Sequence, residues 1–235
     1  MHLDIFPSAN HIEANKLDGA TAVVIDVLRA TSVMVTAFAN GLGELITVTS
    51  PEQAFAMREQ RPEVLLGGEK DAICVPGFDL DNSPFNYTRE RIQGRTLVMS
   101  TSNGTRAIHG ALPASRLLIG AFLNGDAVCK AISDDARVVL VCSGSQNAFT
   151  LEDALCAGFL AHRLEQLGVE LQMTDFALSM KVLYELSMHH LSAVASQGNH
   201  YQLLLKKGFP RDLNYCFTPD LFQVVPRMQD GVIVC

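Results

Sequence analysis

The chain has 235 residues, of which 48% are hydrophobic and 18% charged, and it carries a net charge of −7 at pH 7. This length suits one large domain or two small ones, and the hydrophobic content excludes a chain that is disordered throughout. The acidic balance argues against a general nucleic-acid-binding protein, because such proteins usually carry an excess of basic residues.

Short apolar runs indicate the strands of the protein. Each run is rich in Val, Ile or Leu, and continuous apolar runs are typical of strands that are covered on both faces. The predicted strands are Ala22–Ile25, Leu45–Val48, Val64–Leu66, Leu97–Met99, Leu117–Ile119 and Val138–Cys142, with Leu221–Val225 and Val232–Val234 as further candidates.

Helical patterns lie between the predicted strands. Ser50-Pro51 supplies an N-cap and a first helical residue, and Arg61-Pro62 ends that helix. Thr150 begins a second helix with a capping box, after which leucines keep helical spacing up to Gly168. A third helix is predicted at Asn199–Gly208.

The alternation of strands and helices predicts an α/β fold. We expect a layered α/β/α arrangement around a mostly parallel or mixed sheet, within a single domain of residues 1–235. A candidate boundary between two lobes lies near Gln172–Ala177, where the alternation gives way to helix. The apolar balance permits a homo-oligomer without requiring one.

The six cysteines do not indicate a disulfide framework. None forms a C-x-x-C pair, and Cys74, Cys129, Cys142 and Cys156 lie in apolar runs. We interpret them as reduced thiols, which predicts a cytoplasmic protein. The first ten residues lack the basic region of a signal peptide, and no apolar run approaches the ~20 residues of a membrane span. We therefore predict no membrane association.

Three apolar runs end in a loop of small polar residues that opens a helix, at positions 23–32, 97–107 and 138–153. In open α/β sheets, ligands bind beyond the carboxyl ends of the strands. Helix N-termini at this edge favour anions, because their first N–H groups have no partner within the helix. The three loops therefore predict one shared site for a phosphate-sized anion.

Asp26 ends the first of these runs and is followed by Arg29, Thr31 and Ser32. A carboxylate at this point can hold Mg²⁺ or attack phosphorus, and an arginine can neutralise a phosphoryl oxygen. We predict Asp26 and Arg29 as catalytic residues, with the two hydroxyls in contact with substrate. The same residues equally fit a structural Asp–Arg pair beside a helix cap.

The second loop is dense in hydroxyl groups and ends in a cation. It can offer backbone N–H groups, side-chain donors and an arginine to an anion. An Asn-Gly turn with a capping hydroxyl is the alternative interpretation. The predicted substrate-binding residues are Thr101, Ser102, Asn103, Gly104 and Thr105, with Arg106 as a catalytic residue.

Three further carboxylates follow apolar runs or begin helices. Glu69 comes after Gly67-Gly68, which permits close approach of the backbone. Glu152 and Asp153 lie at a helix start, where the helix dipole favours negative charge. A solvated charge pair of Glu69 with Lys70, and simple helix capping by Asp153, are the alternatives.

Several familiar signatures are missing. The sequence contains no G-x-x-x-x-G-K-[ST] and no G-x-S-x-G, which excludes a P-loop nucleotidase and removes support for a serine hydrolase. No cysteine has an arginine six positions later, which excludes a cysteine phosphatase of the C-x₅-R kind.

Five segments together resemble the 2-phosphosulfolactate phosphatase family, the ComB-like proteins. The segments are VIDVLRATS (24–32), GGE (67–69), GFDLDNSP (77–84), TSNGTRA (101–107) and CSG…FTLEDALCAG (142–158), and the stretch 200–213 is also similar. The resemblance implies a Mg²⁺-dependent phosphatase with its own α/β fold. The family reaction releases phosphate from 2-phospho-3-sulfolactate and gives 3-sulfolactate, which in methanogenic archaea belongs to coenzyme M synthesis.

The resemblance also suggests a set of metal ligands. Under this hypothesis Mg²⁺ is held by Asp26 and Glu69, with Glu152 and Asp153 as further ligands, and Asp26 is either the nucleophile or a ligand. Three segments depart from the family pattern, namely Ser102 in place of a threonine, a third loop with fewer glycines, and Asp175–Tyr184. These departures leave the organic part of the substrate open. A phosphatase for another 2-hydroxy-acid phosphate, or a non-catalytic organophosphate-binding protein, is the alternative function.

Overall fold

Ten strands pair into one sheet in the computed structural model, which describes residues 1–235. The strands are β1 (His2–Phe6), β2 (Thr21–Ile25), β3 (Glu44–Val48), β4 (Leu65–Gly68), β5 (Thr96–Ser100), β6 (Arg116–Gly120), β7 (Arg137–Cys142), β8 (Gln172–Met173), β9 (Arg227–Gln229) and β10 (Val232–Val234). Their order across the sheet is β4-β5-β3-β10-β9-β6-β2-β7-β1-β8. The sheet is therefore mixed, as predicted.

Eleven α-helices and four short 3₁₀ helices accompany the sheet. The α-helices are α1 (Ala14–Leu17), α2 (Ala30–Ala39), α3 (Pro51–Gln60), α4 (Arg89–Ile92), α5 (Gly104–Ala111), α6 (Gly125–Ile132), α7 (Leu151–Gln166), α8 (Asp175–Ser187), α9 (Leu191–Ala195), α10 (Asn199–Lys206) and α11 (Pro210–Cys216). The 3₁₀ helices are η1 (Ala9–His11), η2 (Pro84–Asn86), η3 (Phe122–Asn124) and η4 (Met188–His190).

The C-terminal hairpin of β9 and β10 joins two parallel halves of the sheet. Strands β6, β2, β7, β1 and β8 are parallel to one another, and so are β3, β5 and β4. The three pairings β6–β9, β9–β10 and β10–β3 are all antiparallel, so the smaller half runs opposite to the larger one. Adjacent strands in a sheet rotate by about 20–25°. This accumulated twist turns the two halves so that loops following β2, β4, β5 and β7 reach one region.

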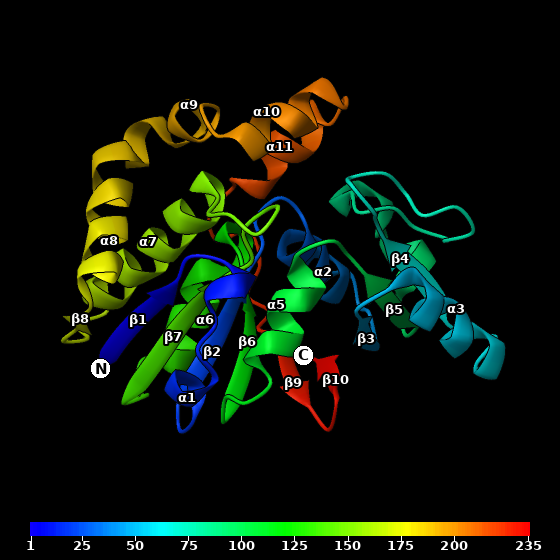
Figure 1. The fold of residues 1–235 in the computed structure, drawn as a ribbon, viewed down its shortest axis with the longest axis horizontal. Coiled ribbons are helices and arrows are strands. Elements are labelled where there is room, and N and C mark those ends of the chain that lie inside the picture. The colour runs from blue at the N-terminus through cyan, green and yellow to red at the C-terminus, as the bar shows by residue number, and fades with distance from the viewer.

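Both faces of the larger half are covered by helices, which produces the expected α/β/α layers (Figure 1). Along β2, Val23 and Ile25 face one hydrophobic cluster, whereas Ala22 and Val24 face the other. Successive side chains of a strand point to opposite faces, so a strand buried on both sides must be continuously apolar. This explains why the apolar runs predicted the central strands.

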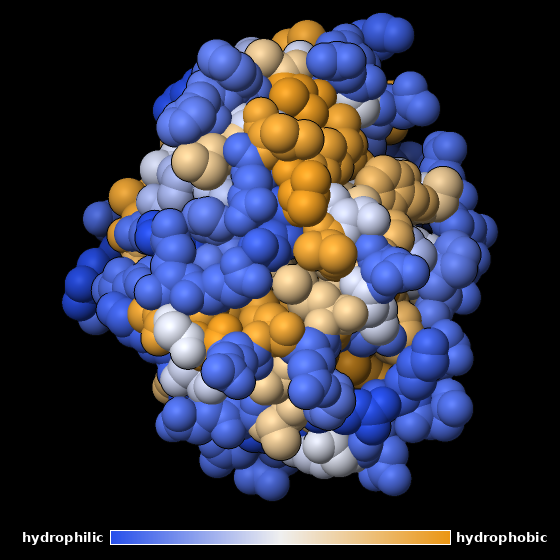
Figure 2. Space-filling view, turned by 90° about the vertical axis from the view of Figure 1, so that its left-hand side faces the viewer, coloured by the Kyte–Doolittle hydropathy of each residue, from blue (hydrophilic) through white to orange (hydrophobic).

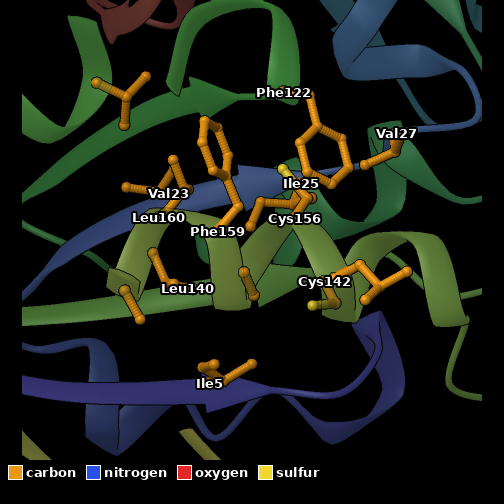
Figure 3. Packing of buried hydrophobic residues seen from close by; sticks show 14 of the residues in the cluster. Ile5, Val23, Ile25, Val27, Phe122, Leu140, Cys142, Cys156, Phe159 and Leu160 are labelled. Carbon is orange, nitrogen blue, oxygen red and sulfur yellow. The ribbon is translucent and has the colours of Figure 1, made fainter. Parts of the chain in front are cut away.

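Helices α6 and α7 cover one face, and α8 packs on the outside of α7 (Figure 1). Figure 3 shows Cys156, Phe159 and Leu160 of α7 packed near Val23 and Ile25 of β2. Burying a side chain of this size stabilises the fold by about 1.5–3 kcal/mol. Helices α2 and α5 cover the opposite face.

The strands β4 and β5 with α3 form a smaller cluster of their own, built around Val64, Leu66 and Val98. In Figure 1 this part projects from the main body beside β3. The candidate boundary near Gln172–Ala177 does not coincide with this projecting part. Ala177 belongs to the same buried cluster as α7.

The six strands predicted from apolar runs within residues 22–142 lie within two residues of their predicted bounds. The strand predicted at Val64–Leu66 continues to Gly68, because Gly67 and Gly68 pair with Met99 and Ser100 of β5. The expected strand at Leu221–Val225 is wrong. The backbone N–H groups at its beginning, those of Asp220 and Phe222, donate to the carbonyls of Phe122 and Leu123 instead of to a strand. Strands β1, β8 and β9 were not predicted.

The capping box predicted at Thr150 is also wrong, although α7 does begin at Leu151. The hydroxyl of Thr150 accepts no capping hydrogen bond and has no partner. All six cysteines are free thiols, but Cys74 is exposed despite its apolar neighbours. None of the helices combines the length and apolar character needed to cross a membrane.

Candidate active site

A cavity of about 470 Å³ lies where the loops after β2, β4, β5 and β7 meet helix α10. In Figure 1, α10 and α11 lie across the end of the sheet at which these strands finish. The polar and charged residues that line the cavity are Asp26, Arg29, Glu69, Asp71, Asn82, Ser102, Asn103, Arg106, Ser145, Gln146, Asn147, His200 and Lys207. The structure thus brings together the three loops that the sequence singled out.

Asp26 directly follows β2 and is almost fully buried. Its Oδ1 atom accepts a hydrogen bond of 3.1 Å from the amide of Ala30, at the start of α2, and no hydrogen bond is formed to Oδ2. Burial raises the pKa of Asp26, since a charged carboxylate loses solvation there, whereas the nearby His200 and the nearby Ser143 hydroxyl lower it. Asp26 therefore offers one free carboxylate oxygen in the cavity.

The loop after β5 is held against Glu69. The two oxygens of Glu69 accept hydrogen bonds from the amide of Ser102 (2.7 Å) and the amide of Ala72 (2.6 Å), and the Ser102 hydroxyl donates at 3.1 Å. A β-carbon at Gly68 would lie 1.9 Å from the carbonyl oxygen of Ser100, so only glycine fits between these strands. Glu69 is thus not the solvated partner of Lys70 that the alternative interpretation required.

Asp153 accepts hydrogen bonds from the loops that follow β2 and β7. Its Oδ1 accepts from the amide of Val27 (2.9 Å), and its Oδ2 accepts from the amide of Gly144 (3.0 Å) and the hydroxyl of Ser143 (3.1 Å). Its carboxylate therefore turns away from its own helix, which is why no capping box forms. Burial raises the pKa of Asp153, and the neighbouring Asp26 raises it further. Asp153 does not line the cavity.

Glu152 is paired with His200. Its Oε1 atom lies 2.7 Å from Nδ1 of His200, and its buried Oε2 atom has no partner. Burial by itself lowers the pKa of His200, but the hydrogen bond to Glu152 and the charges of Glu152, Asp26 and Asp153 raise it above the ordinary value. Since Nδ1 is engaged and His200 lines the cavity, its Nε2 is the ring atom available to a ligand.

Arg29 is a buried cation with a buried partner. Its Nη1 donates to Oδ2 of Asp212 at 2.6 Å, its guanidinium lies 3.9 Å from the ring centre of Phe209, and Oδ1 of Asp212 accepts from the Ser83 hydroxyl. The alternative of a structural Asp–Arg pair is thus realised, but with Asp212 of α11 and not with Asp26. Arg29 also lines the cavity.

Arg106 and Lys207 are the cavity cations without a carboxylate partner. Arg106 donates to the side-chain oxygens of Asn147 (3.2 Å) and Asn10 (2.6 Å), which hold the guanidinium without neutralising it. Lys207 donates to the backbone carbonyl of Asp71. Two uncompensated cations beside a buried carboxylate suit an anionic ligand.

The predicted substrate-binding hydroxyls fall into two groups. Ser102 and Asn103 line the cavity. Thr31, Ser32, Thr101 and Thr105 do not line the cavity. The hydroxyls of Thr31, Ser32 and Thr105 donate to backbone carbonyls, and the hydroxyl of Thr101 accepts from the amide of Thr105. These buried groups fix the loops and not a ligand, while Gly104 allows α5 to approach Asp26 closely.

Comparison with known proteins identifies the family of this chain. A family model described as 2-phosphosulpholactate phosphatase matches residues 6–231. The chain belongs to this family. Membership makes the protein a phosphatase, an enzyme that hydrolyses phosphoric monoesters, and it confirms the family and the enzyme class expected from the sequence.

Three relatives named probable 2-phosphosulfolactate phosphatase illustrate the match. They come from Clostridium perfringens strain SM101, Clostridium novyi and Clostridium beijerinckii, and are 39%, 37% and 35% identical to this chain. The alignments cover 99%, 97% and 100% of this chain and 96%, 97% and 100% of the relatives. The similarity to family members therefore extends over the whole fold and not only over the cavity.

The donor set of this phosphatase fits Mg²⁺ in one mode of binding. No three His, Cys, Asp or Glu side chains are grouped so that they could hold a metal by themselves, so the four ligands expected from the sequence do not form a complete protein site. Mg²⁺ is commonly bound through one or two carboxylates, with substrate phosphate and water completing its shell. Asp26, with a free oxygen, and Glu69 both line the cavity and are suited to this role.

The sequence did not point to His200, Lys207, Asn82 or the side chains of Ser145–Asn147 as members of the site. His200 lies on α10, and Lys207 directly follows the last residue of this helix, seven positions after His200, which places the two on one side. That spacing was visible in the sequence, but nothing in it showed that α10 would lie over β2 and β5.

Proposed function

We propose that this protein hydrolyses 2-phospho-3-sulfolactate to 3-sulfolactate and inorganic phosphate, with Mg²⁺ as its metal. The observation that carries the proposal is the placement of Arg106 and Lys207, cations without carboxylate partners, in one cavity with Asp26. A substrate with phosphate, carboxylate and sulfonate groups carries a large negative charge, which a protein of net charge −7 must offset locally. The names of the clostridial relatives support the same substrate.

Arg106 and the N-terminus of α5 would bind the phosphoryl oxygens. Helix α5 begins at Gly104, and its first N–H groups lie beside Asn103 at the cavity wall. Lys207, which also lines the cavity, would pair with a second acidic group of the substrate. Asp26 and Glu69 would hold Mg²⁺, which when bound supplies positive charge to the phosphoryl oxygens and orients the ester.

His200 would act as the general acid. In hydrolysis an oxygen nucleophile forms a bond to phosphorus, the P–O bond to the organic group breaks, and the departing alkoxide requires a proton. Protonated His200 can donate that proton from Nε2, because Glu152 holds the ring through Nδ1 and stabilises the imidazolium. The pair therefore supplies a positioned proton donor next to the predicted phosphate site.

Asp26 has two roles open to it. Its free Oδ2 could attack phosphorus and form an aspartyl-phosphate, or it could hold the metal while water attacks. The stereochemical course at phosphorus separates the roles. With a substrate whose phosphoryl group is made chiral by oxygen isotopes, net retention indicates an aspartyl-phosphate, because two in-line displacements occur, and net inversion indicates direct attack by water.

The proposal is tested by phosphate release from 2-phospho-3-sulfolactate, 2-phospholactate and a simple alkyl phosphate, each with Mg²⁺ and with EDTA. We expect Mg²⁺-dependent turnover with the sulfonated ester preferred. The Arg106→Ala variant should lose about 10²-fold in kcat/KM, whereas Arg89→Ala, at an exposed arginine outside the cavity, should be unchanged. Preference for phospholactate would assign a different 2-hydroxy-acid phosphate, and binding without turnover would assign an organophosphate-binding role.

A further inference from the structure

The outer face of α8 is apolar and uncovered. Its residues Leu178, Val182 and Leu186 follow one another at intervals of four, which places them on one side of the helix. All three are exposed, and Leu186 is 80% exposed. The opposite side of α8, which includes Ala177, packs on the core.

This face is part of a larger hydrophobic area. Figure 2 looks at the side of the molecule on which α8 lies and shows a continuous hydrophobic area bordered by hydrophilic residues. Single exposed leucines are ordinary, but contiguous exposed apolar areas on a protein surface mark sites of association. None of the residues of this face lines the catalytic cavity.

The face is complementary to itself in an antiparallel arrangement. When two copies of α8 are opposed about Val182, Val182 meets its own copy and Leu178 meets Leu186. The same register sets Asp175, at the beginning of the helix, opposite His189, just beyond its end, and both residues are exposed. A carboxylate thus faces an imidazole that can donate a hydrogen bond, at both ends of the contact.

The spacing agrees with helices that run side by side. Positions 175, 178 and 182 of α8 are separated by three and four residues, and Leu186 lies four residues beyond Val182, so all four fall on one side of the helix, as in helices that pack along their length. A twofold axis through Val182 makes the contact closed, because each copy uses the same surface. The polar ends and apolar centre match the usual arrangement of a protein interface.

We propose that two copies of this chain associate through α8, in antiparallel orientation about a twofold axis at Val182. The occupant of the hydrophobic face is therefore a second copy of the protein. The proposal does not depend on the substrate, and activity is expected to persist in a monomeric variant.

The first test is the association state by sedimentation equilibrium over a range of protein concentrations. We expect a dimer for the native chain and a dimer dissociation constant raised at least about tenfold by Leu186→Lys. Leu186 is largely exposed, so its replacement leaves the fold intact. The matched control is Leu112→Lys at a leucine that is 47% exposed outside this face, and it should leave the dimer unchanged.

Two further variants test the register. With Cys74 and Cys235 replaced by serine, Val182→Cys should form an intersubunit disulfide under copper phenanthroline, and Leu112→Cys should not. Asp175→His and His189→Asp should each weaken the dimer, and the double variant should restore it. A native chain that is monomeric at high concentration, or a dimer unaffected by Leu186→Lys, would overturn the proposal, as would failure of both the crosslink and the restoration.

Discussion

A β-carbon added at Gly104 would lie 2.6 Å from the β-carbon of Ala30 and 2.7 Å from Oδ2 of Asp26. The neighbouring atoms belong to a buried helix start and to the carboxylate of the site, so neither can move freely. We expect Gly104→Ala to displace α5 from the loop after β2, to lower the free energy of unfolding by about 1–3 kcal/mol and to reduce kcat. Urea unfolding and phosphate release measure the two effects.

Gly110→Ala in the same helix is the matched control. Its added β-carbon would meet only the end of the Ile12 side chain, at 2.6 Å, which can rotate away. The stability and the activity of this variant should stay close to those of the native chain. Equal losses in both variants would mean that α5 tolerates alanine at neither position and that the close approach of Gly104 to Asp26 does not account for the loss.

His200→Asn tests the assignment of the general acid. An alkyl ester with a poor leaving group should lose about 10²–10⁴-fold in kcat, whereas p-nitrophenyl phosphate, whose leaving group needs no proton, should lose far less. His190→Asn, at an exposed histidine, should change neither rate. Equal losses for both esters would show that His200 binds or supports the site without donating a proton.

The native pH profile depends on the same residue and on Asp26. Activity requires an ionised Asp26 and a protonated His200. We therefore expect kcat to rise as the pH passes the pKa of Asp26, which burial raises to about 6, and to fall as the pH rises through the pKa of His200. Because Glu152 and the nearby carboxylates raise that pKa above 6.5, the fall should lie on the alkaline side of an ordinary histidine. A fall confined to the acidic side would contradict the assignment.

The site residues that could be predicted are those whose position follows from the neighbouring sequence. Asp26, Ser102 and Arg106 follow apolar runs directly, so their place at a strand end was visible from local pattern. His200 lies 48 residues from Glu152, and its role depends on how α10 folds back over the sheet. The sequence could not show that the buried threonines lie outside the cavity lining, because a hydroxyl bonded to the backbone has the same sequence signal as one that faces a ligand.

At the scale of elements, the position of α10 and α11 over the site depends on one buried ion pair. Asp212 of α11 binds Arg29 and Ser83, and thereby ties α10 and α11 to the loop after β2. Asp212→Ala leaves the Arg29 guanidinium buried without a counter-charge. We expect a loss of about 3–5 kcal/mol in the free energy of unfolding, measured in urea.

The exposed pair of Lys130 and Asp126 is the control for this prediction. Lys130→Ala should cost no more than about 1 kcal/mol, because water screens the pair and can replace it. A similar small loss for Asp212→Ala would show that α11 is not anchored through Arg29.

Strand and helix bounds were predictable where burial is continuous, as in β2 and β7. They were not predictable where another contact decides the structure. Thr150 has the sequence of a capping box, yet Asp153 at the third helical position binds Val27 and Gly144 instead. The segment Leu221–Val225 is apolar enough for a strand, but its backbone contacts η3 outside the sheet.

At the scale of the whole molecule, two parallel half-sheets of opposite direction are joined by the β9–β10 hairpin. The α/β class and the layers followed from the pattern of apolar runs. The reversal between the halves did not, since it depends on a pairing between Ile233 and Leu45 across nearly the whole chain. This arrangement allows loops from both halves to meet at one cavity.

The central claim is that this meeting point is a phosphatase site organised around Asp26. The most direct measurement is phosphate release from 2-phospho-3-sulfolactate by the native chain and by Asp26→Asn, at equal protein and Mg²⁺ concentrations. We predict steady turnover by the native chain and a loss of at least about 10²-fold in the variant, because both open roles of Asp26 need its ionised oxygen. Full activity in Asp26→Asn would contradict the claim.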